Sequence, residues 1–207
     1  MERYMMILKS LKRMNPELEQ ALRENVYPIP VQKQDIFQIP FARKEHLYFI
    51  EKGLFRYYIK IKSKEYTLEF KQEDQFMIGL KNIDDAYQSE GLGIEALEES
   101  LLWCIPGDLV KELREKYPRF SFQCFQIYIR DHSEAAIAKH CTWPGGTMGN
   151  FDCLREDFPH LIPRVPLWHL ANFTQIPEWK LRHLLASPIK LNGSATRRRR
   201  RRSKGTV

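Results

Sequence analysis

The stretch FPHLIPRVPLWHLANFTQIPEWKLRHLL, residues 158–185, decides the fold of the C-terminal part of the chain. Two short helices that meet at a sharp angle need a small residue where they cross and apolar residues at fixed offsets around it. Ala171 is the small residue here. The apolar positions are taken by Leu170, Ile176, Leu181 and Leu184. The stretch therefore predicts a helix-turn-helix, with a first helix over 166–173 and a second from about 177 to 185.

Four residues on the second predicted helix are candidate contacts to double-stranded DNA. The exposed face of this helix carries Trp179, Arg182 and His183, with Lys180 at its edge. An arginine can hydrogen-bond a guanine through two donors, and a lysine or histidine can contact a phosphate. The alternative is that Lys180 and Arg182 only solvate a surface helix.

The turn between the two helices departs from the usual pattern at two positions. Gln175 stands where a left-handed backbone conformation usually selects glycine, and Thr174 occupies an expected apolar position. The apolar core of the motif is retained. A second interpretation therefore stays open, namely a degenerate helix-turn-helix in a module that acts through an unknown ligand or protein partner without reading DNA.

The middle of the chain, residues 31–105, consists of short β-branched and aromatic runs separated by turn residues. The predicted strands lie at 35–39, 46–50, 54–61, 66–70, 75–80, 94–97 and 101–105. Short strands at this spacing indicate an antiparallel roll or sandwich. Before them, residues 1 to about 24 carry apolar side chains at helical spacing and predict a short helical lead-in.

A single long helix is predicted after Pro118, where apolar side chains recur at spacings of three and four residues. The stripe that they form consists of Phe122, Phe125, Ile129, His132 and Ala136. This stripe predicts a dimerisation helix over 118–141, and burial of the same stripe against the chain's own roll is the open alternative. Glycines at 145, 146 and 149 then predict a flexible hinge over 142–150.

The formal charge of +7 comes from the C-terminal tail rather than from the rest of the chain. Six consecutive arginines at 197–202 and Lys204 supply seven positive charges, and the other residues are formally neutral as a set. Because like charges repel and bury no apolar surface, residues 191–207 are expected to be disordered. Such a tail adds non-specific affinity for a polyanion but no sequence specificity.

Composition and motifs exclude several classes of protein. The four cysteines form no C-x-x-C pair, which argues against a zinc ribbon or a dense disulfide framework. The roll contains one histidine, His46, whereas a metal-binding roll enzyme needs two histidines and a carboxylate. We therefore expect no metal, no cofactor and no enzymatic activity. The N-terminal residues resemble no secretory signal and no apolar run is long enough to span a membrane, so a cytoplasmic protein is predicted.

Three segments, in this order along the chain, resemble the Crp/Fnr family of transcriptional regulators. They are LYFIEKGLFRYY at 47–58, IEALEES at 94–100, and residues 158–173 of the stretch quoted above. The resemblance covers about residues 1–190 and implies an α+β fold in three parts. These parts are an N-terminal antiparallel β-roll of the cyclic-nucleotide-binding type over 1–117, a long dimerisation helix over 118–141, and a winged-helix-like helix-turn-helix domain over 151–190.

The resemblance further implies a homodimeric regulator that binds a palindromic operator in double-stranded DNA and responds to a small-molecule effector. Family members that bind cyclic AMP hold its phosphate with a glycine-glutamate pair and an arginine followed by serine or threonine. The matching segment here, QSEGLG at 88–93, has no arginine, so we expect no ordinary cyclic AMP site and assign no effector. The clustered N-terminal cysteines with which the oxygen-sensing branch holds an iron–sulfur cluster are also missing.

Overall fold

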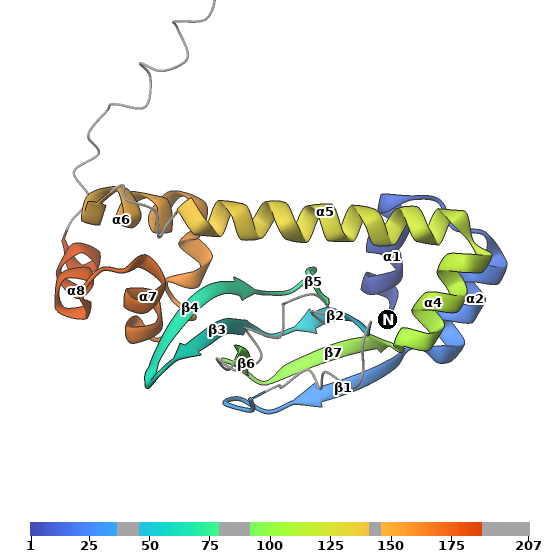
Figure 1. Ribbon diagram of the computed structural model, residues 1–207, viewed down its shortest axis with the longest axis horizontal. Helices are drawn as coiled ribbons and strands as arrows, with labels where there is room; N and C mark the ends of the chain where they lie inside the picture. The colour runs from blue at the N-terminus through green and yellow to red at the C-terminus, as the bar shows by residue number, and fades with distance from the viewer. Residues whose placement is uncertain (37–45, 79–91, 141–145, 188–207) are drawn as a thin grey trace, which may run out of the picture.

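The computed structural model describes residues 1–36, 46–78, 92–140 and 146–187, and two antiparallel sheets form its centre (Figure 1). The first sheet has the order β1 (Tyr27–Val31), β7 (Ser100–Ile105), β2 (Leu47–Lys52), β5 (Phe76–Ile78). The second sheet has the order β4 (Lys64–Lys71), β3 (Phe55–Ile61), β6 (Leu92–Ala96). Ile50, Phe55, Tyr57 and Leu102 belong to one apolar core that both sheets share. The predicted β-roll is confirmed.

The main difference from the predicted strands lies at one edge of the roll. The sequence does not predict β1, because Pro28 and Pro30 interrupt it. The two prolines are tolerated because β1 pairs only with β7, and an edge strand leaves alternate N–H groups without a partner. Of the predicted strand 35–39, Ile36 forms an isolated bridge. Residues 37–39 of that strand and residues 79–80 lie outside the described residues.

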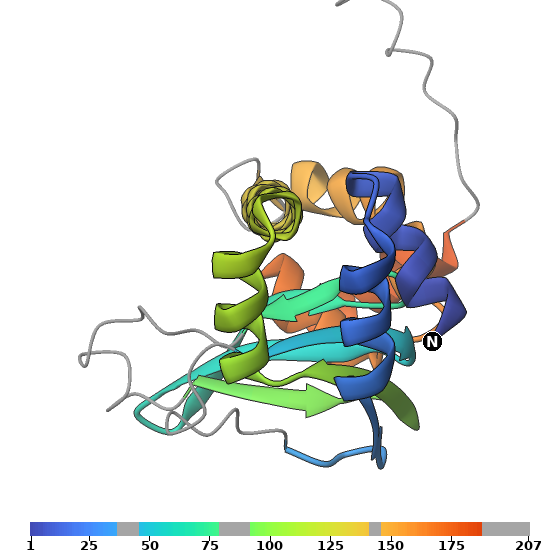
Figure 2. The same cartoon turned by 90° about the vertical axis from the view of Figure 1, so that its right-hand side faces the viewer.

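Two helices form the N-terminal lead-in. α1 (Glu2–Leu11) is followed by α2 (Pro16–Asn25). A proline at the first position of α2 favours the start of a new helix and cannot continue the first one. The Tyr4 ring of α1 packs on the first sheet, 5.5 Å from the Phe49 ring and 6.3 Å from the Phe76 ring. Figure 2 shows the lead-in helices and α4 (Gly107–Lys116) at one end of the roll.

α5 (Pro118–His140) is a 23-residue helix that runs alongside the roll from the lead-in to the C-terminal helices (Figure 1). Its inward face carries Phe120, Gln123 and Ile127, which are all buried. The Gln123 Nε2 donates to the carbonyl oxygens of Leu8 and Lys12, both at 2.8 Å, and so satisfies the end of α1. One face of α5 is therefore fixed to the lead-in and the roll, and the opposite face is open.

The C-terminal unit consists of α6 (Gly146–Asp157), η1 (Pro159–Leu161), α7 (Leu167–Thr174) and α8 (Glu178–Ala186). Helix α6 begins inside the segment 142–150, which shortens the predicted hinge at its C-terminal end. Glycine disfavours a helix interior by about 0.5–1 kcal/mol, and burial of Asn150, Phe151 and Leu154 offsets this loss. No wing strand follows α8 up to Ser187, the last described residue, and the predicted tail at 191–207 lies beyond it.

Gly53 and Gly149 should respond in opposite ways to substitution by alanine. Gly53 has a φ of +114°, and a Cβ there would lie 1.9 Å from the Ser100 Oγ. Gly53→Ala should therefore lower the free energy of unfolding by about 2 kcal/mol or more. Gly149 lies within α6, and a Cβ there would meet nothing within 4 Å. Gly149→Ala should raise the free energy of unfolding by about 0.5–1 kcal/mol in urea titrations followed by circular dichroism, and a loss would contradict its helical placement.

Candidate nucleic-acid interface

The helix-turn-helix that the sequence predicts is formed by α7 and α8 around a shared apolar core. Leu170, Ala171, Ile176 and Leu181 are all buried in this core. The observed bounds of both helices differ from the predicted ones by one residue at each end. The offsets around Ala171 therefore place both helices correctly, because each apolar position falls on the face that the partner helix covers.

The turn accommodates both departures from the usual pattern. Gln175 adopts the left-handed conformation, with φ 55° and ψ 27°. The N–H of Ile176 then donates to the Ala171 carbonyl oxygen at 3.1 Å, as in an ordinary helix end. Thr174 is fully buried, and its hydroxyl donates to the Leu170 carbonyl oxygen at 2.7 Å. Because both polar residues are satisfied locally, the absence of a turn glycine does not prevent the motif from forming.

Three of the four predicted DNA contacts on α8 are exposed. Trp179 is 74% exposed, and Arg182 and His183 also face solvent. The Arg182 guanidinium lies 2.7 Å from the carboxylate of a glutamate one turn earlier. An exposed ion pair of this kind contributes little to stability, so Arg182 can leave it for another partner. Lys180 is half-buried, and its Nζ donates to the Thr147 Oγ1 at 3.3 Å, which turns it toward α6. Contact of these residues with DNA stays a prediction.

The predicted stripe on α5 lies on the open face of that helix. The exposed fractions are 42% for Phe122, 56% for Phe125 and 44% for Ile129, and His132 is exposed as well. Tyr128, which the sequence pattern did not single out, is 51% exposed and its ring stacks on that of His132 at 5.5 Å. The side chain of Ala136 lies outside the described residues. These exposures speak against burial of the stripe on the chain's own roll.

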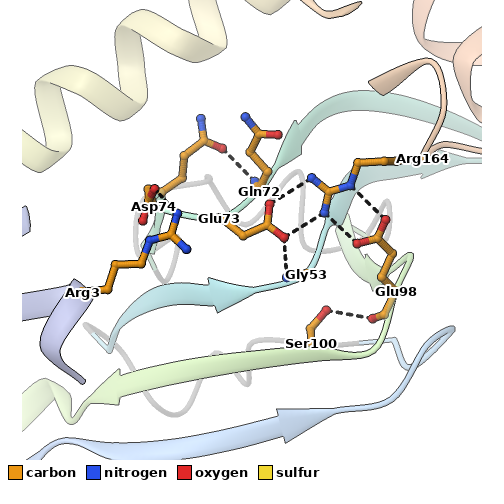
Figure 3. A network of polar contacts seen from close by, with 9 residues as sticks. Arg3, Gly53, Gln72, Glu73, Asp74, Glu98, Ser100 and Arg164 are labelled. Carbon is orange, nitrogen blue, oxygen red and sulfur yellow. Dashed lines mark hydrogen bonds and ion pairs between the residues drawn. The ribbon is translucent and has the colours of Figure 1, made fainter. Parts of the chain in front are cut away.

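Arg164, in the connection between η1 and α7, ties the C-terminal unit to the roll (Figure 3). Its guanidinium donates to the Glu98 carboxylate at 3.0 and 2.7 Å and to the Glu73 carboxylate at 2.9 and 2.9 Å. Glu73 also accepts the N–H of Gly53 at 2.9 Å. Burial alone would raise the pKa of Glu73, but the bonds from Arg164 and Gly53 together hold it below its usual value. We call this arrangement the Arg164 fork.

Arg56 of β3 is buried at the same junction, with 2% of its side chain exposed. Its Nη2 lies 2.6 Å from the Glu65 carboxylate of β4 and 2.8 Å from the Glu95 carboxylate of β6. The guanidinium carbon also lies 4.3 Å from the ring centre of Tyr58 and 5.4 Å from that of Trp168 on α7. The sequence interpretation missed Arg56 and Arg164, because the sequence shows a cation among apolar residues but does not show which carboxylates pair with it.

His169 packs beside Arg56 and stays neutral. Its side chain is 1% exposed, and its Nε2 lies 3.7 Å from the Glu95 carboxylate. Burial, and then the positive charge of Arg56, lower the pKa of His169 from 6.5 to about 3. The unfolded chain takes up a proton on this histidine near its ordinary pKa, whereas the folded chain does not. Acid therefore favours the unfolded state between these two values.

Stability should fall as the pH is lowered from about 6.5 toward about 3, and His169 should contribute a slope of up to about 1.4 kcal/mol per pH unit. His169→Gln should flatten this slope, because glutamine does not titrate. His183→Gln makes the same substitution on the exposed face of α8 and is the matched control. Urea unfolding at several pH values between about 7 and 4.5 measures the slope. An unchanged slope in His169→Gln would show that the folded chain protonates this histidine readily.

The described residues contain neither a metal site nor a membrane-spanning helix. No group of histidine, cysteine and acidic side chains among them is arranged to hold a metal. None of their helices is long and apolar enough to cross a membrane.

The segment that lacks the phosphate-binding arginine is described only in part, because its residues 88–91 lie outside the described residues. At its described end, a Cβ on Gly93 would lie 2.3 Å from the Tyr58 ring, so this ring fills the space beside β6.

Comparison with known proteins identifies the fold. No protein-family model and no curated protein matches the sequence. A cyclic nucleotide-binding domain-containing protein from Listeria monocytogenes superimposes with a TM-score of 0.65 at 12% identity, over 88% of this chain and 88% of its own. FixK2 from Bradyrhizobium japonicum gives 0.62 at 9% identity, over 77% and 82%. A Crp/Fnr-family transcriptional regulator from Eubacterium rectale gives 0.59 at 17% identity, over 83% and 82%. The chain therefore has the α+β fold of the Crp/Fnr regulators, with a cyclic-nucleotide-binding-type β-roll followed by a helix-turn-helix.

Proposed function

We propose that the chain is a sequence-specific DNA-binding transcriptional regulator that acts as a homodimer. The observation that carries this proposal is the reading face of α8, where Trp179, Arg182 and His183 stay exposed while the opposite side packs into the helix-turn-helix core. The second helix of such a motif enters the major groove, where an arginine can read guanine. The fold, shared with a protein described as a Crp/Fnr-family regulator, supports the same function. The proposal includes no enzymatic step, and it places the protein in the cytoplasm.

The open face of α5 supports the homodimer. Its apolar residues at 122, 125, 128 and 129 each keep 42–56% of their surface exposed. Pairing with α5 of a second copy would bury this surface, and burial stabilises by about 25 cal/mol per Å² of apolar area. Two-fold symmetry would then place two α8 helices in successive major grooves about 34 Å apart, which predicts a palindromic operator.

The roll is the proposed sensor, and its small-molecule effector is unidentified. Ordinary cyclic AMP recognition is not part of the proposal, because the segment 88–93 has no arginine to hold a phosphate. An effector acts on such a protein only through its different affinity for two arrangements of the roll and the helix-turn-helix.

Selection of bound fragments from random double-stranded DNA tests sequence-specific binding. The chain shortened after Lys190 is compared with the full chain, because the arginines at 197–202 add non-specific affinity. Enrichment of a palindrome would support the proposal. A folded dimer that enriches no sequence would contradict it and favour a cyclic-nucleotide-binding-like module that acts through a ligand or protein partner.

Arg182→Ala should weaken binding to the selected operator by about 1–3 kcal/mol, because its guanidinium is expected to hydrogen-bond a base. Fluorescence anisotropy at fixed salt, with the operator and its single-base variants, measures this loss. Lys111→Ala, which removes one exposed positive charge from α4, is the matched control and should bind as the parent does. An equal loss on all sequences would make Arg182 a phosphate contact instead.

Phe125→Glu should convert the dimer into a monomer, because it would place a carboxylate against the apolar face of the partner helix. Sedimentation equilibrium measures the change. Ile61→Glu introduces the same charge at a β3 side chain that is 39% exposed, so it serves as the control and should remain dimeric. A Phe125→Glu variant that sediments as a dimer would exclude the stripe as the interface.

A further inference from the structure

β4 is an edge strand, and α7 covers its free edge (Figure 1). Within its sheet β4 pairs only with β3, so one row of its N–H and C=O groups has no strand partner. The N–H of Thr67 and the carbonyl oxygen of Glu65 lie in this row. Such groups need another strand, or a side chain that offers the same donor and acceptor.

Asn172 of α7 provides both partners. Its Oδ1 accepts the N–H of Thr67, and its Nδ2 donates to the carbonyl oxygen of Glu65 at 2.8 Å. A carboxamide offers an acceptor and a donor side by side, as a strand backbone does. Thr67 is 3% exposed, so a broken bond there would leave a buried backbone group without its partner. Asn172 therefore binds the β4 edge in the way that an additional strand would.

The contact around Asn172 combines apolar packing with ion pairs. The Phe173 ring of α7 meets the Phe70 ring of β4 at 5.2 Å, with the two planes 72° apart. Leu54 and Leu97 of the roll belong to the same apolar cluster as the helix-turn-helix core. The Arg164 fork adds two carboxylates of the roll to this contact. The two units thus share a core as well as a polar clamp.

Docking of α7 leaves the reading face of α8 free. With α7 on the β4 edge, Trp179 is 74% exposed and the Arg182 side chain is 70% exposed. At its other end β4 is held to α5, because the Lys71 Nζ lies 2.7 Å from the Asp131 carboxylate. β4 therefore connects the helix that carries the exposed stripe with the helix that precedes the reading helix.

We propose that Asn172 is a positioning residue, which docks α7 on the free edge of β4 and so holds α8 at a fixed place relative to α5. This inference rests on the proposed function, because it takes α8 as the reading helix. A reading helix that is already in place loses less conformational freedom when it binds. Docking should therefore strengthen operator binding.

Hydrogen–deuterium exchange of the full chain without DNA tests the docking itself. In Asn172→Ala, the amides of residues 64–71 should exchange at least about tenfold faster than in the parent, because Thr67 loses its acceptor and the strand edge is uncovered. Peptides from α6 and α8 should keep their protection. Asn25→Ala removes an exposed carboxamide that bonds within α2 and is the matched control, with no change expected in β4.

Asn172→Asp separates the loss of hydrogen bonding from the loss of side-chain volume. Aspartate keeps the shape and the acceptor, but its carboxylate cannot donate to the carbonyl oxygen of Glu65. Because the new carboxylate and the carbonyl oxygen of Glu65 repel each other, α7 should leave the strand edge, and exchange in 64–71 should rise although an acceptor for the Thr67 N–H is kept. Unchanged exchange there in either variant, or a loss of protection throughout α6 and α8, would overturn the docking.

Operator affinity tests the positioning. Both variants should bind the selected operator about tenfold or more weakly, with the salt dependence of the parent, because the number of phosphate contacts does not change. Unchanged affinity in a variant whose β4 edge exchanges freely would overturn the positioning role. A parent chain that binds no specific sequence would overturn the proposed function and the positioning role together, while the exchange result would still decide the docking.

Discussion

The buried charge of Arg56 constrains the region where the roll meets the helix-turn-helix. A buried guanidinium needs carboxylate partners, since removal of one partner from such a pair typically costs about 3–5 kcal/mol. Glu65 comes from β4 and Glu95 from β6, on either side of β3, so the ion cluster fixes the register of three strands at once. The same charge helps to keep His169 neutral, and the ring of Trp168 lies over it. Helix α7 is thus part of the environment that makes a charge in the roll tolerable.

Lys71 repeats this arrangement at the other end of β4. Its Nζ is paired with Asp131 at 2.7 Å and lies 3.6 Å from Glu134, both on α5. Burial would lower the pKa of Lys71, but the carboxylates of Glu69 and Asp131 raise it above its usual value. Apolar packing has no preferred direction, whereas a charge-assisted hydrogen bond is satisfied in one geometry. Two buried cations on adjacent strands therefore define how α5, the roll and α7 fit together, which apolar contact alone does not.

The sequence predicts the local features of this fold and misses its long-range polar contacts. The helix-turn-helix follows from offsets within 158–185, and turn residues delimit most of the strands. β1 is missed because its two prolines contradict a strand unless its place at a sheet edge is already known. Asn172 and Arg164 bond to residues 66–107 positions away, and no local periodicity encodes such pairs. The exposure of Trp179, Arg182 and His183 on α8 agrees with the sequence pattern because it depends on a single helix, whereas the predicted pairing of the α5 stripe and the predicted DNA contacts stay predictions.

The surfaces of the chain differ in how completely their groups have partners. At the junction between the roll and α7, the charged side chains of Arg56 and Arg164 have carboxylate partners. The stripe on α5 and Trp179 on α8 instead expose large apolar surfaces to water. These surfaces contribute no hydrophobic stabilisation unless a partner covers them. β4 contacts α5 through Lys71 and α7 through Asn172. β4 thus contacts both the helix that carries the open stripe and the helix that precedes α8, so one strand holds the two helices behind these exposed surfaces.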